Sequence, residues 1–310
     1  MATPFHADES LDLDGFANAI RFMGSAGADG VTVVGVLGES NRITDAERER
    51  LVRCAVEAAG SVGRPFPVCV GTSHSGTAAT VALSQMAQEL GAAAVMVTPS
   101  KEASGNWDDA LLTLYSRVAA GCPGLPIVLQ DHPGSTQVHM PVPLLAKIVA
   151  EVPSVGCIKL ESLPTPAKIA ALRAAWAKLP PAQECTILTG LGALYAGYDM
   201  EQGTQGFMTG FAFPEVLKAM NSAAQVGDLA TAHTLYQRYL PLMVFEQQPG
   251  VAVRKELYRL RGLIGSNAVR HPANAVAPAL SIALQAALAR ALPGIDVKQP
   301  LPAELFAAGR

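Results

Sequence analysis

The chain has 310 residues, a hydrophobic content of 50%, a mean hydropathy of +0.26 and a formal net charge of −3. This length allows one large α/β barrel or two smaller domains, each with a sizeable core. The sequence has no basic run and no apolar run long enough to span a bilayer, so neither a nucleic-acid partner nor a membrane partner is expected.

The first residues and the cysteines bear on the compartment. The segment Met1–Asp8 has neither the basic region nor the apolar region of a signal peptide, which favours a cytoplasmic protein. The five cysteines lie far apart and form no Cys-x-x-Cys pair, which predicts free thiols and no metal site.

Helical and strand-like segments alternate along most of the chain. Apolar residues at helical spacing predict a helix over Leu13–Met23, and β-branched residues predict a strand over Val31–Val36. Thr44 and Glu47 have the spacing of a capping box and open a second predicted helix, which runs towards Gly60. Further strands are predicted over 67–70, 93–97, 126–129, 155–161, 186–188 and 206–209, and further helices over 77–90, 107–120, 144–152, 167–179 and 194–198.

Regular alternation of this kind predicts an α/β fold whose parallel strands close into a (β/α)8 TIM barrel. From Pro214 onward the pattern is helical only. We therefore assign residues 1–222 to the barrel and residues 223–310 to a C-terminal helical appendage. Because so few residues precede Phe5, we expect the first barrel strand to be truncated or absent.

Lys159 stands at the end of the predicted strand over 155–161. A buried ammonium is costly unless it is paired or neutralised. Desolvation lowers the pKa of a lysine, and a neutral amine is a nucleophile that forms Schiff bases with carbonyl compounds. From the strand alone, a lysine that emerges into solvent where the strand ends is the favoured interpretation, since most lysines are exposed. Glu161 follows on the same face of the strand, where it either sets the protonation state of Lys159 or is solvated at the rim.

Several motifs occur along the chain in one order and cover nearly all of it. They are Thr3–Phe5, Gly35–Arg48, Gly71–Thr77, Ile158-Lys159 and Gly206–Gly210 with Pro214. Together they resemble the dihydrodipicolinate synthase/N-acetylneuraminate lyase family of Schiff-base lyases. The resemblance implies a (β/α)8 barrel, a homodimer or homotetramer, a small 2-oxo acid such as pyruvate as substrate, and Lys159 as the catalytic lysine. It implies no separate cofactor, because the lysine itself forms a covalent imine with the substrate.

The sequence departs from the family pattern at positions that bear on substrate. Val36 and Leu37 replace hydroxyl residues that hold the substrate carboxylate, so we expect backbone N–H groups around Leu37–Glu39 to bind this anion instead. Gln130 replaces the proton-shuttling tyrosine, and an amide has no titratable proton. Ser135 replaces the arginine that binds the synthase's substrate, so dihydrodipicolinate synthase activity itself is not expected.

The segments Thr72–His74, Gln130–Pro133 and Met208–Pro214 are similar to the 2-keto-3-deoxy-L-arabonate dehydratase branch. This similarity implies removal of water from a 2-keto-3-deoxy sugar acid through the lysine imine. The pair Gly38-Glu39 differs from that branch, which leaves the exact substrate open. Two alternatives also stay open, namely an aldolase of the same family that releases pyruvate and a catalytically silent sugar-acid-binding or regulatory protein.

A dehydratase needs groups that move protons at C3 and C4 of the substrate. His74 is our first candidate, because the unperturbed pKa of histidine, about 6.5, suits proton transfer. The alternative for His74 is a polar residue that contacts the next turn at a helix entry. His132 is the second candidate, and Gln130 is expected to orient a hydroxyl or a water molecule.

The remaining predicted site residues have binding or positioning roles. Asp131 is expected to fix its loop through an Asx turn. Glu39 is expected to tether its loop through backbone N–H groups, with action on the substrate as the alternative. Thr209 either offers its hydroxyl to a carboxylate or to the lysine, or is a strand-end residue bonded to nearby backbone. The predicted catalytic residues are Lys159, His74 and Gln130, and the predicted substrate-binding residues are Val36, Leu37, Gly38, Glu39, Asp131, His132, Thr209 and Met208.

Overall fold

The structure is a computed structural model that describes residues 1–102, 106–178, 185–247 and 250–307. Its residues divide into two compact units. The sheet unit comprises Cys69–Gly190 and Tyr198–Met208, and the helical unit comprises Met1–Val68, Leu191–Gly197 and Thr209–Arg310.

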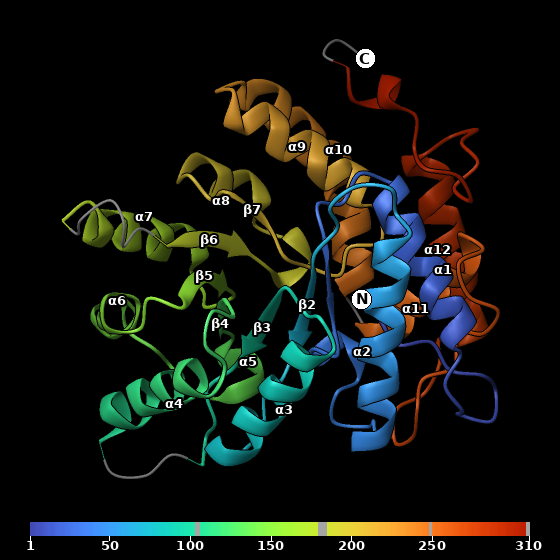
Figure 1. Cartoon of the computed structure of the whole chain (residues 1–310). Coiled ribbons are helices and arrows are strands. Elements are labelled where there is room, and N and C mark those ends of the chain that lie inside the picture. Colours follow the sequence, from blue (N-terminus) through green and yellow to red (C-terminus); the bar gives the residue numbers. More distant parts are fainter. Residues whose placement is uncertain (103–105, 179–184, 248–249, 308–310) are drawn as a thin grey trace. The chain divides into compact units, whose positions relative to one another are not determined.

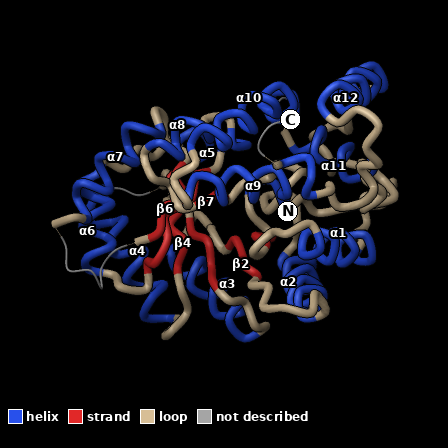
Figure 2. Tube along the Cα trace, turned by 90° about the horizontal axis from the view of Figure 1, so that it is seen from above, coloured by secondary structure: helices blue, strands red, loops and turns tan. Residues whose placement is uncertain are grey.

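Parallel strands form the sheet unit, and each strand pairs with the next one along the chain. The strands are β2 (Val68–Gly71), β3 (Ala94–Val97), β4 (Ile127–Asp131), β5 (Val155–Leu160), β6 (Thr186–Thr189) and β7 (Gly206–Phe207). The helices between them are α3 (Thr77–Glu89), α4 (Trp107–Gly121), α5 (Pro133–Thr136), α6 (Val142–Glu151), α7 (Thr165–Trp176) and α8 (Ala196–Glu201). In Figures 1 and 2, α3, α4, α6 and α7 lie outside these strands. This parallel, sequential topology is the one predicted from the sequence.

Small and medium apolar side chains fill one face of this sheet. The buried members are Cys69, Met96 and Val128, against which Ala94, Cys157 and Met208 pack. Side chains alternate between the two faces of a strand. Lys159 follows Cys157 by two residues, and Gln130 follows Val128 by two, so both polar side chains project from the face that carries this apolar cluster.

The helical unit contains the remaining elements. They are α1 (Leu13–Ser25), β1 (Val31–Val33), η1 (Val36–Gly38), α2 (Asp45–Gly60), η3 (Leu191–Ala193), α9 (Pro214–Gln225), α10 (Leu229–Gln247), α11 (Val251–Leu260), α12 (Pro278–Ala291) and η4 (Ala303–Phe306). The predicted capping box of α2 is confirmed, because Thr44 Oγ1 accepts from the Glu47 amide while the Glu47 carboxylate accepts from the Thr44 amide. None of the described helices combines the length and hydropathy needed to cross a bilayer.

Two predicted elements end three residues earlier than expected. The strand over Val31–Val36 stops at Val33, because Val34 has a φ of 56°, a left-handed conformation that a β-branched residue rarely adopts and that breaks an extended chain. The helix over 167–179 corresponds to α7, and Leu179 lies outside the described residues.

The first residues of the chain also belong to the helical unit. The terminal ammonium of Met1 donates to the Thr32 carbonyl at 2.6 Å, and Phe5 forms an isolated antiparallel bridge with Leu11. The predicted boundary after residue 222 falls within α9. Arg261 pairs with Glu215 of α9 at 2.7 Å, so the described C-terminal helices are linked to one another by buried polar contacts.

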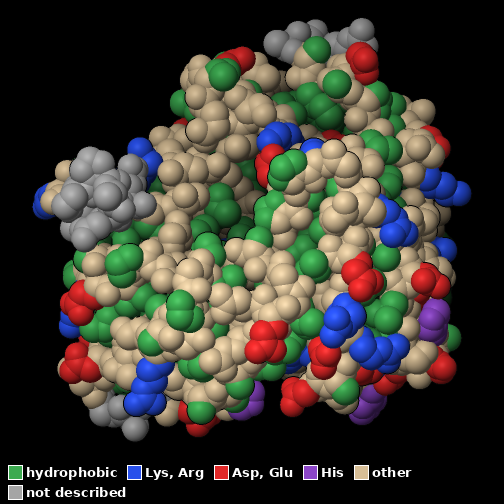
Figure 3. Space-filling model, in the orientation of Figure 1, with side chains coloured by type: hydrophobic (Ala, Val, Ile, Leu, Met, Phe, Trp, Pro, Cys, Tyr) green, Lys and Arg blue, Asp and Glu red, His purple; other side chains and the backbone are tan. Residues whose placement is uncertain are grey.

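On the face shown in Figure 3, acidic and basic side chains are interspersed.

Candidate active site

Lys159 lies at the end of β5 and is largely buried. Its Nζ is 3.2 Å from Glu161 Oε2, and the exposed fractions of the two side chains are 12% and 8%. The strand register places Lys159 beside Gln130 of β4 and Leu188 of β6. Lys159 therefore does not emerge into solvent, and its amine faces a carboxylate within the sheet unit.

Gln130 joins the ion pair of Lys159 and Glu161 through a hydrogen bond. Its Nε2 donates to Glu161 Oε2 at 2.6 Å, and the residue is only 2% exposed. An ionised carboxylate only accepts hydrogen bonds, so this contact fixes which end of the amide faces Glu161. The other end, Oε1, is buried and has no hydrogen-bond partner among the described residues. The structure thus brings together two predicted catalytic residues, Lys159 and Gln130, through Glu161.

Gly190, directly after β6, leaves the space that Glu161 occupies. A Cβ atom at this position would lie 2.2 Å from Glu161 Oε1 and 2.4 Å from its Cδ, closer than real contacts allow. A side chain at position 190 would therefore displace the Glu161 carboxylate from this position. No sequence motif indicated this pairing, because it depends on how β5 and β6 are aligned.

Asp131 follows Gln130 but points to the opposite face of β4. Its carboxylate accepts from Lys168 Nζ of α7 at 2.6 Å, and the same ammonium donates to the Met140 carbonyl at 2.7 Å. Burial raises the pKa of Asp131, although the charge of Lys168 opposes this shift. The predicted Asx turn is wrong, since the side chain joins a strand to a helix. This arrangement does not support substrate binding by Asp131.

Asp199 of α8 is a third buried carboxyl in the sheet unit, after Glu161 and Asp131. It is 2% exposed and accepts from Thr165 Oγ1 at 2.6 Å, and burial raises its pKa to about 6. The folded state therefore holds a proton on this group up to about pH 6, whereas the unfolded chain releases it near pH 3.8. The stability that this group contributes is present below the lower value and is lost as the pH rises through about 6.

Replacement of Asp199 by asparagine is accordingly expected to stabilise the protein at pH 8 by about 2–3 kcal/mol. The amide oxygen can still accept from Thr165, while the cost of a buried charge is removed. Urea unfolding at pH 8 and at pH 4 checks this, with the difference between the two proteins much smaller at the lower pH. Equal stabilisation at both values would contradict the assignment.

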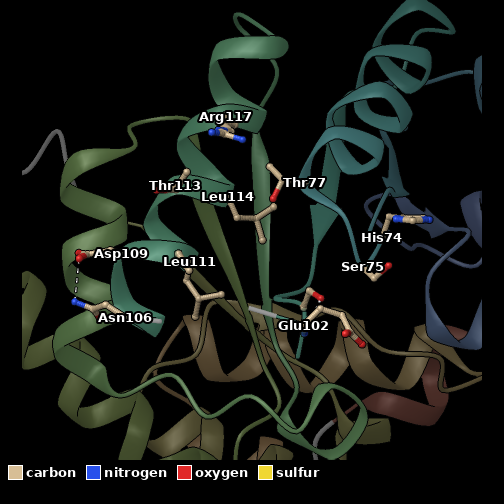
Figure 4. A pocket seen from close by; sticks show the side chains of 12 residues that line it. His74, Ser75, Thr77, Glu102, Asn106, Asp109, Leu111, Thr113, Leu114 and Arg117 are labelled. Carbon is tan, nitrogen blue, oxygen red and sulfur yellow. Dashed lines mark hydrogen bonds between the residues drawn. The ribbon is translucent and has the colours of Figure 1, made fainter. Parts of the chain in front are cut away.

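His74 lies at the entry to α3. Its Nδ1 accepts from the Gly76 amide at 3.0 Å, a contact with the next turn. His74 also lines a cavity of about 500 Å³, whose other lining residues come mainly from the entry to α3 and from α4 (Figure 4). Neither Lys159 nor Glu161 lines this cavity. The geometry thus favours a local structural role for His74 over proton transfer at Lys159.

His132 makes a similar local contact. Its Nδ1 is 2.7 Å from Ser135 Oγ, within the turn that starts the short helix α5. Proton transfer by His132 gains no support from this contact.

Val36–Glu39, the turn predicted to bind a carboxylate, belongs to the helical unit and is a single 3₁₀ turn. The amide of Gly38 donates to the Gly35 carbonyl at 2.9 Å, and that of Glu39 to the Val36 carbonyl at 3.1 Å. The expectation that these two amides bind an anion is therefore wrong, because the turn itself uses them. Substrate binding by Val36, which is 49% exposed, and by Leu37 stays a prediction.

Glu39 holds this turn to distant parts of the helical unit. It is 1% exposed and forms ion pairs with Lys255 and with Arg42, the latter at 3.0 Å, and it accepts from the Arg270 amide at 3.2 Å. The tethering role is confirmed, although the partners lie mostly outside its own loop. Lys255 is fully buried over the Phe5 ring, and burial lowers its pKa to about 8. Sequence reasoning missed Lys255, which gives no local signal beyond its place in an amphipathic helix.

Replacement of Glu39 by glutamine is expected to lower the free energy of unfolding by about 3 kcal/mol, because it leaves the Lys255 ammonium buried without a countercharge. Combining it with Lys255→Met should restore part of the loss, and chemical denaturation of both variants measures this coupling. The matched control is Glu49→Gln, whose exposed pair with Arg53 contributes at most about 1 kcal/mol. A loss for Glu39→Gln no larger than for the control would contradict the ion pair.

The last-strand motif is divided between the units. Thr209 Oγ1 accepts from the Gly192 amide at 2.8 Å, a contact between loops of the helical unit. This is the structural role of a residue bonded to nearby backbone, and a contact of Thr209 with substrate stays a prediction. Met208 packs on the apolar cluster of the sheet unit and supports the face from which Lys159 projects.

Comparison with known proteins identifies the family. The model of the Dihydrodipicolinate synthetase family matches residues 1–291. The L-2-keto-3-deoxyarabonate dehydratase of Azospirillum brasilense is 35% identical over 274 residues, covering 87% of this chain and 85% of that protein. A protein of Streptomyces coelicolor named 4-hydroxy-tetrahydrodipicolinate synthase 2 is 33% identical, covering 85% and 84%.

Solved structures agree in fold over nearly the whole chain. The dihydrodipicolinate synthase of Rhodopseudomonas palustris superposes with a TM-score of 0.86 at 31% identity, covering 94% of this chain and 95% of that one. YagE of Escherichia coli K12, solved in complex with pyruvate, superposes with a TM-score of 0.83 at 26% identity, covering 94% and 96%. The chain has the α/β fold of these proteins and belongs to the dihydrodipicolinate synthetase family.

Proposed function

We propose that this protein is a Schiff-base lyase that removes water from a 2-keto-3-deoxy sugar acid. The observation that carries the proposal is the buried chain of Lys159, Glu161 and Gln130, which offers a nucleophile and a proton carrier at one strand end. The Azospirillum dehydratase supports the choice of reaction. The Streptomyces relative carries a synthase name, so similarity alone does not select the activity.

The first steps form the imine. Attack on a ketone requires a neutral amine, so Glu161 first takes a proton from Lys159. The neutral amine then adds to C2 of the substrate. A proton passes from the newly bonded nitrogen to the C2 oxygen, and Glu161 then donates its own proton to the resulting hydroxyl, which leaves as water and gives an iminium with Glu161 ionised again. In this mechanism Glu161 holds the proton that Lys159 loses until the C2 oxygen accepts it.

The following steps eliminate the hydroxyl. The iminium withdraws electrons, so Glu161 can remove a proton from C3 to give an enamine. The protonated carboxyl then delivers that proton to the C4 hydroxyl, which departs as water and leaves a conjugated iminium. For a pentonate, loss of the C5 proton and of the C5 hydroxyl proton, with protonation at C3 and C4, converts the C5 alcohol into an aldehyde, and water then releases the 2-oxo acid semialdehyde from Lys159. In this mechanism Glu161 acts as both the general acid and the general base. Gln130 cannot take either role, because its side chain has no titratable proton.

Borohydride trapping tests the proposal. The protein is incubated with pyruvate or a 2-keto-3-deoxypentonate, reduced, digested and analysed by peptide mass. We expect an adduct on Lys159 with both compounds, and from the pentonate a 2-oxoglutarate semialdehyde. Pyruvate with an aldehyde as products would support the aldolase instead, and the lack of any adduct would support a silent binding protein. We also propose a homo-oligomer, dimer or tetramer, in the cytoplasm, and sedimentation tests the association state.

A further inference from the structure

We infer that Gln130 and Gly190 are positioning residues that keep Glu161 ionised and directed at Lys159, and thereby set the pH range in which the site works. The inference rests on the proposed function and specifies how the proton carrier of that function is controlled. It gives Gln130 a role through Glu161 rather than on the substrate.

The first support is the hydrogen bond from Gln130. A bond of 2.6 Å from an amide to a carboxylate is a short, charge-assisted contact. A donor of this kind stabilises the ionised form of the acceptor. Gln130 is only 2% exposed and its bond to Glu161 is buried, so solvent water does not compete for this amide in the folded state. Gln130 therefore opposes protonation of Glu161 until Lys159 or the substrate supplies a proton.

The second support is the space at Gly190. Any side chain there would occupy the place of the Glu161 carboxyl group, since even a methyl carbon would lie 2.2 Å from its oxygen. Gly156 on β5 offers a contrast, because nothing lies within 4 Å of a Cβ atom built there. Close packing on one side and a hydrogen bond on the other thus hold Glu161 at 3.2 Å from Lys159.

The charged side chains near Glu161 also affect its ionisation. Lys159 on β5 favours the ionised carboxylate. Asp131 on β4 is electrostatically coupled to Glu161 and repels it, but Lys168 compensates its charge at 2.6 Å. Among the described residues that contact Glu161, Gln130 supplies a donor without a charge of its own. Removing this donor should therefore change the pKa of Glu161 while leaving every charged side chain of the site in place.

The experiment measures kcat/KM against pH for Gln130→Met. The acidic limb of this profile reports the free enzyme's essential base. We expect the limb to move to higher pH by about one unit, since a hydrogen bond to the charged form is lost. Borohydride adduct formation with pyruvate should persist at high pH. Gln88→Met is the matched control, because Gln88 donates to the Pro123 carbonyl at the surface and should leave the profile unchanged.

A second variant, Gly190→Ala, tests the position of the Glu161 carboxylate without removing any polar group. Gly190→Ala should lower kcat by about 100-fold, the order expected for a displacement of about 1 Å in a catalytic group. Gly156→Ala should stay within twofold of the unaltered protein. Circular dichroism and thermal unfolding establish that each variant is folded.

The outcomes separate this inference from the proposed function. An unaltered protein that forms no Lys159 adduct would overturn the function. If adducts form but the acidic limb of Gln130→Met does not move, or Gly190→Ala retains full turnover, the positioning role is wrong while the function stands. A shifted limb together with a damaged Gly190→Ala supports the inference.

Discussion

Replacement of Lys159 by methionine is expected to lower turnover of a 2-keto-3-deoxy sugar acid by about 10⁴-fold or more, the scale seen when a covalent nucleophile is removed. Methionine has a similar length but no amine, so neither the imine nor the electron sink can form. Initial rates of product formation give the loss, and peptide mass after borohydride reduction gives the missing adduct.

Lys147→Met is the control for this variant. Lys147 is 43% exposed and lies 3.8 Å from Asp109 at the surface, so its replacement should leave both adduct and turnover intact. If Lys159→Met retained a hundredth of the activity or more, the chemistry would not proceed through this amine. Full loss in both variants would indicate damage to folding, which unfolding curves detect.

The position of Lys159 followed from the sequence because its determinants are local. A short apolar run predicts a buried strand, and alternation along that strand decides which side chains share a face. The same argument placed Glu161 on the face of Lys159 but left two interpretations open. Burial excludes the solvated interpretation, because Glu161 is 8% exposed, and the register of β4 on β5 brings Gln130 beside Lys159 and directs its amide to Glu161.

The misses concern partners that are distant in sequence. The Arg270 amide that binds Glu39 is 231 residues away, and no periodicity links such positions. Lys255 and Lys168 are buried lysines of this kind, each paired with a carboxylate from a remote segment. His74 shows the opposite error, in which a catalytic role was predicted from residue type. Its side chain instead accepts a hydrogen bond within its own loop. Residue type suggested the chemistry, whereas tertiary packing determined which carboxylates and cations meet.

Replacement of Glu161 by glutamine is expected to lower turnover by about 10³-fold, within the range that a positioned general acid and base contributes. The amide has nearly the same volume as the carboxyl group and can still accept a hydrogen bond from Gln130. It cannot take the proton that Lys159 must lose, nor return one to a leaving hydroxyl. Initial rates of product formation across pH values measure the effect.

The pH dependence makes this variant diagnostic. Without a neighbouring carboxyl, Lys159 must lose its proton to solvent, so adduct formation with pyruvate should become slow near neutral pH and accelerate as the pH rises. The exposed Glu151, at the end of α6, provides the matched control Glu151→Gln, which should behave as the unaltered protein. Full activity in Glu161→Gln would show that Glu161 is not the proton carrier. The role would then be assigned to His74, and the His74→Asn variant would be inactive. Because His74 contacts its own loop and Glu161 contacts the amine, we expect His74→Asn to lose less than about tenfold, well below the contribution of a general acid or base.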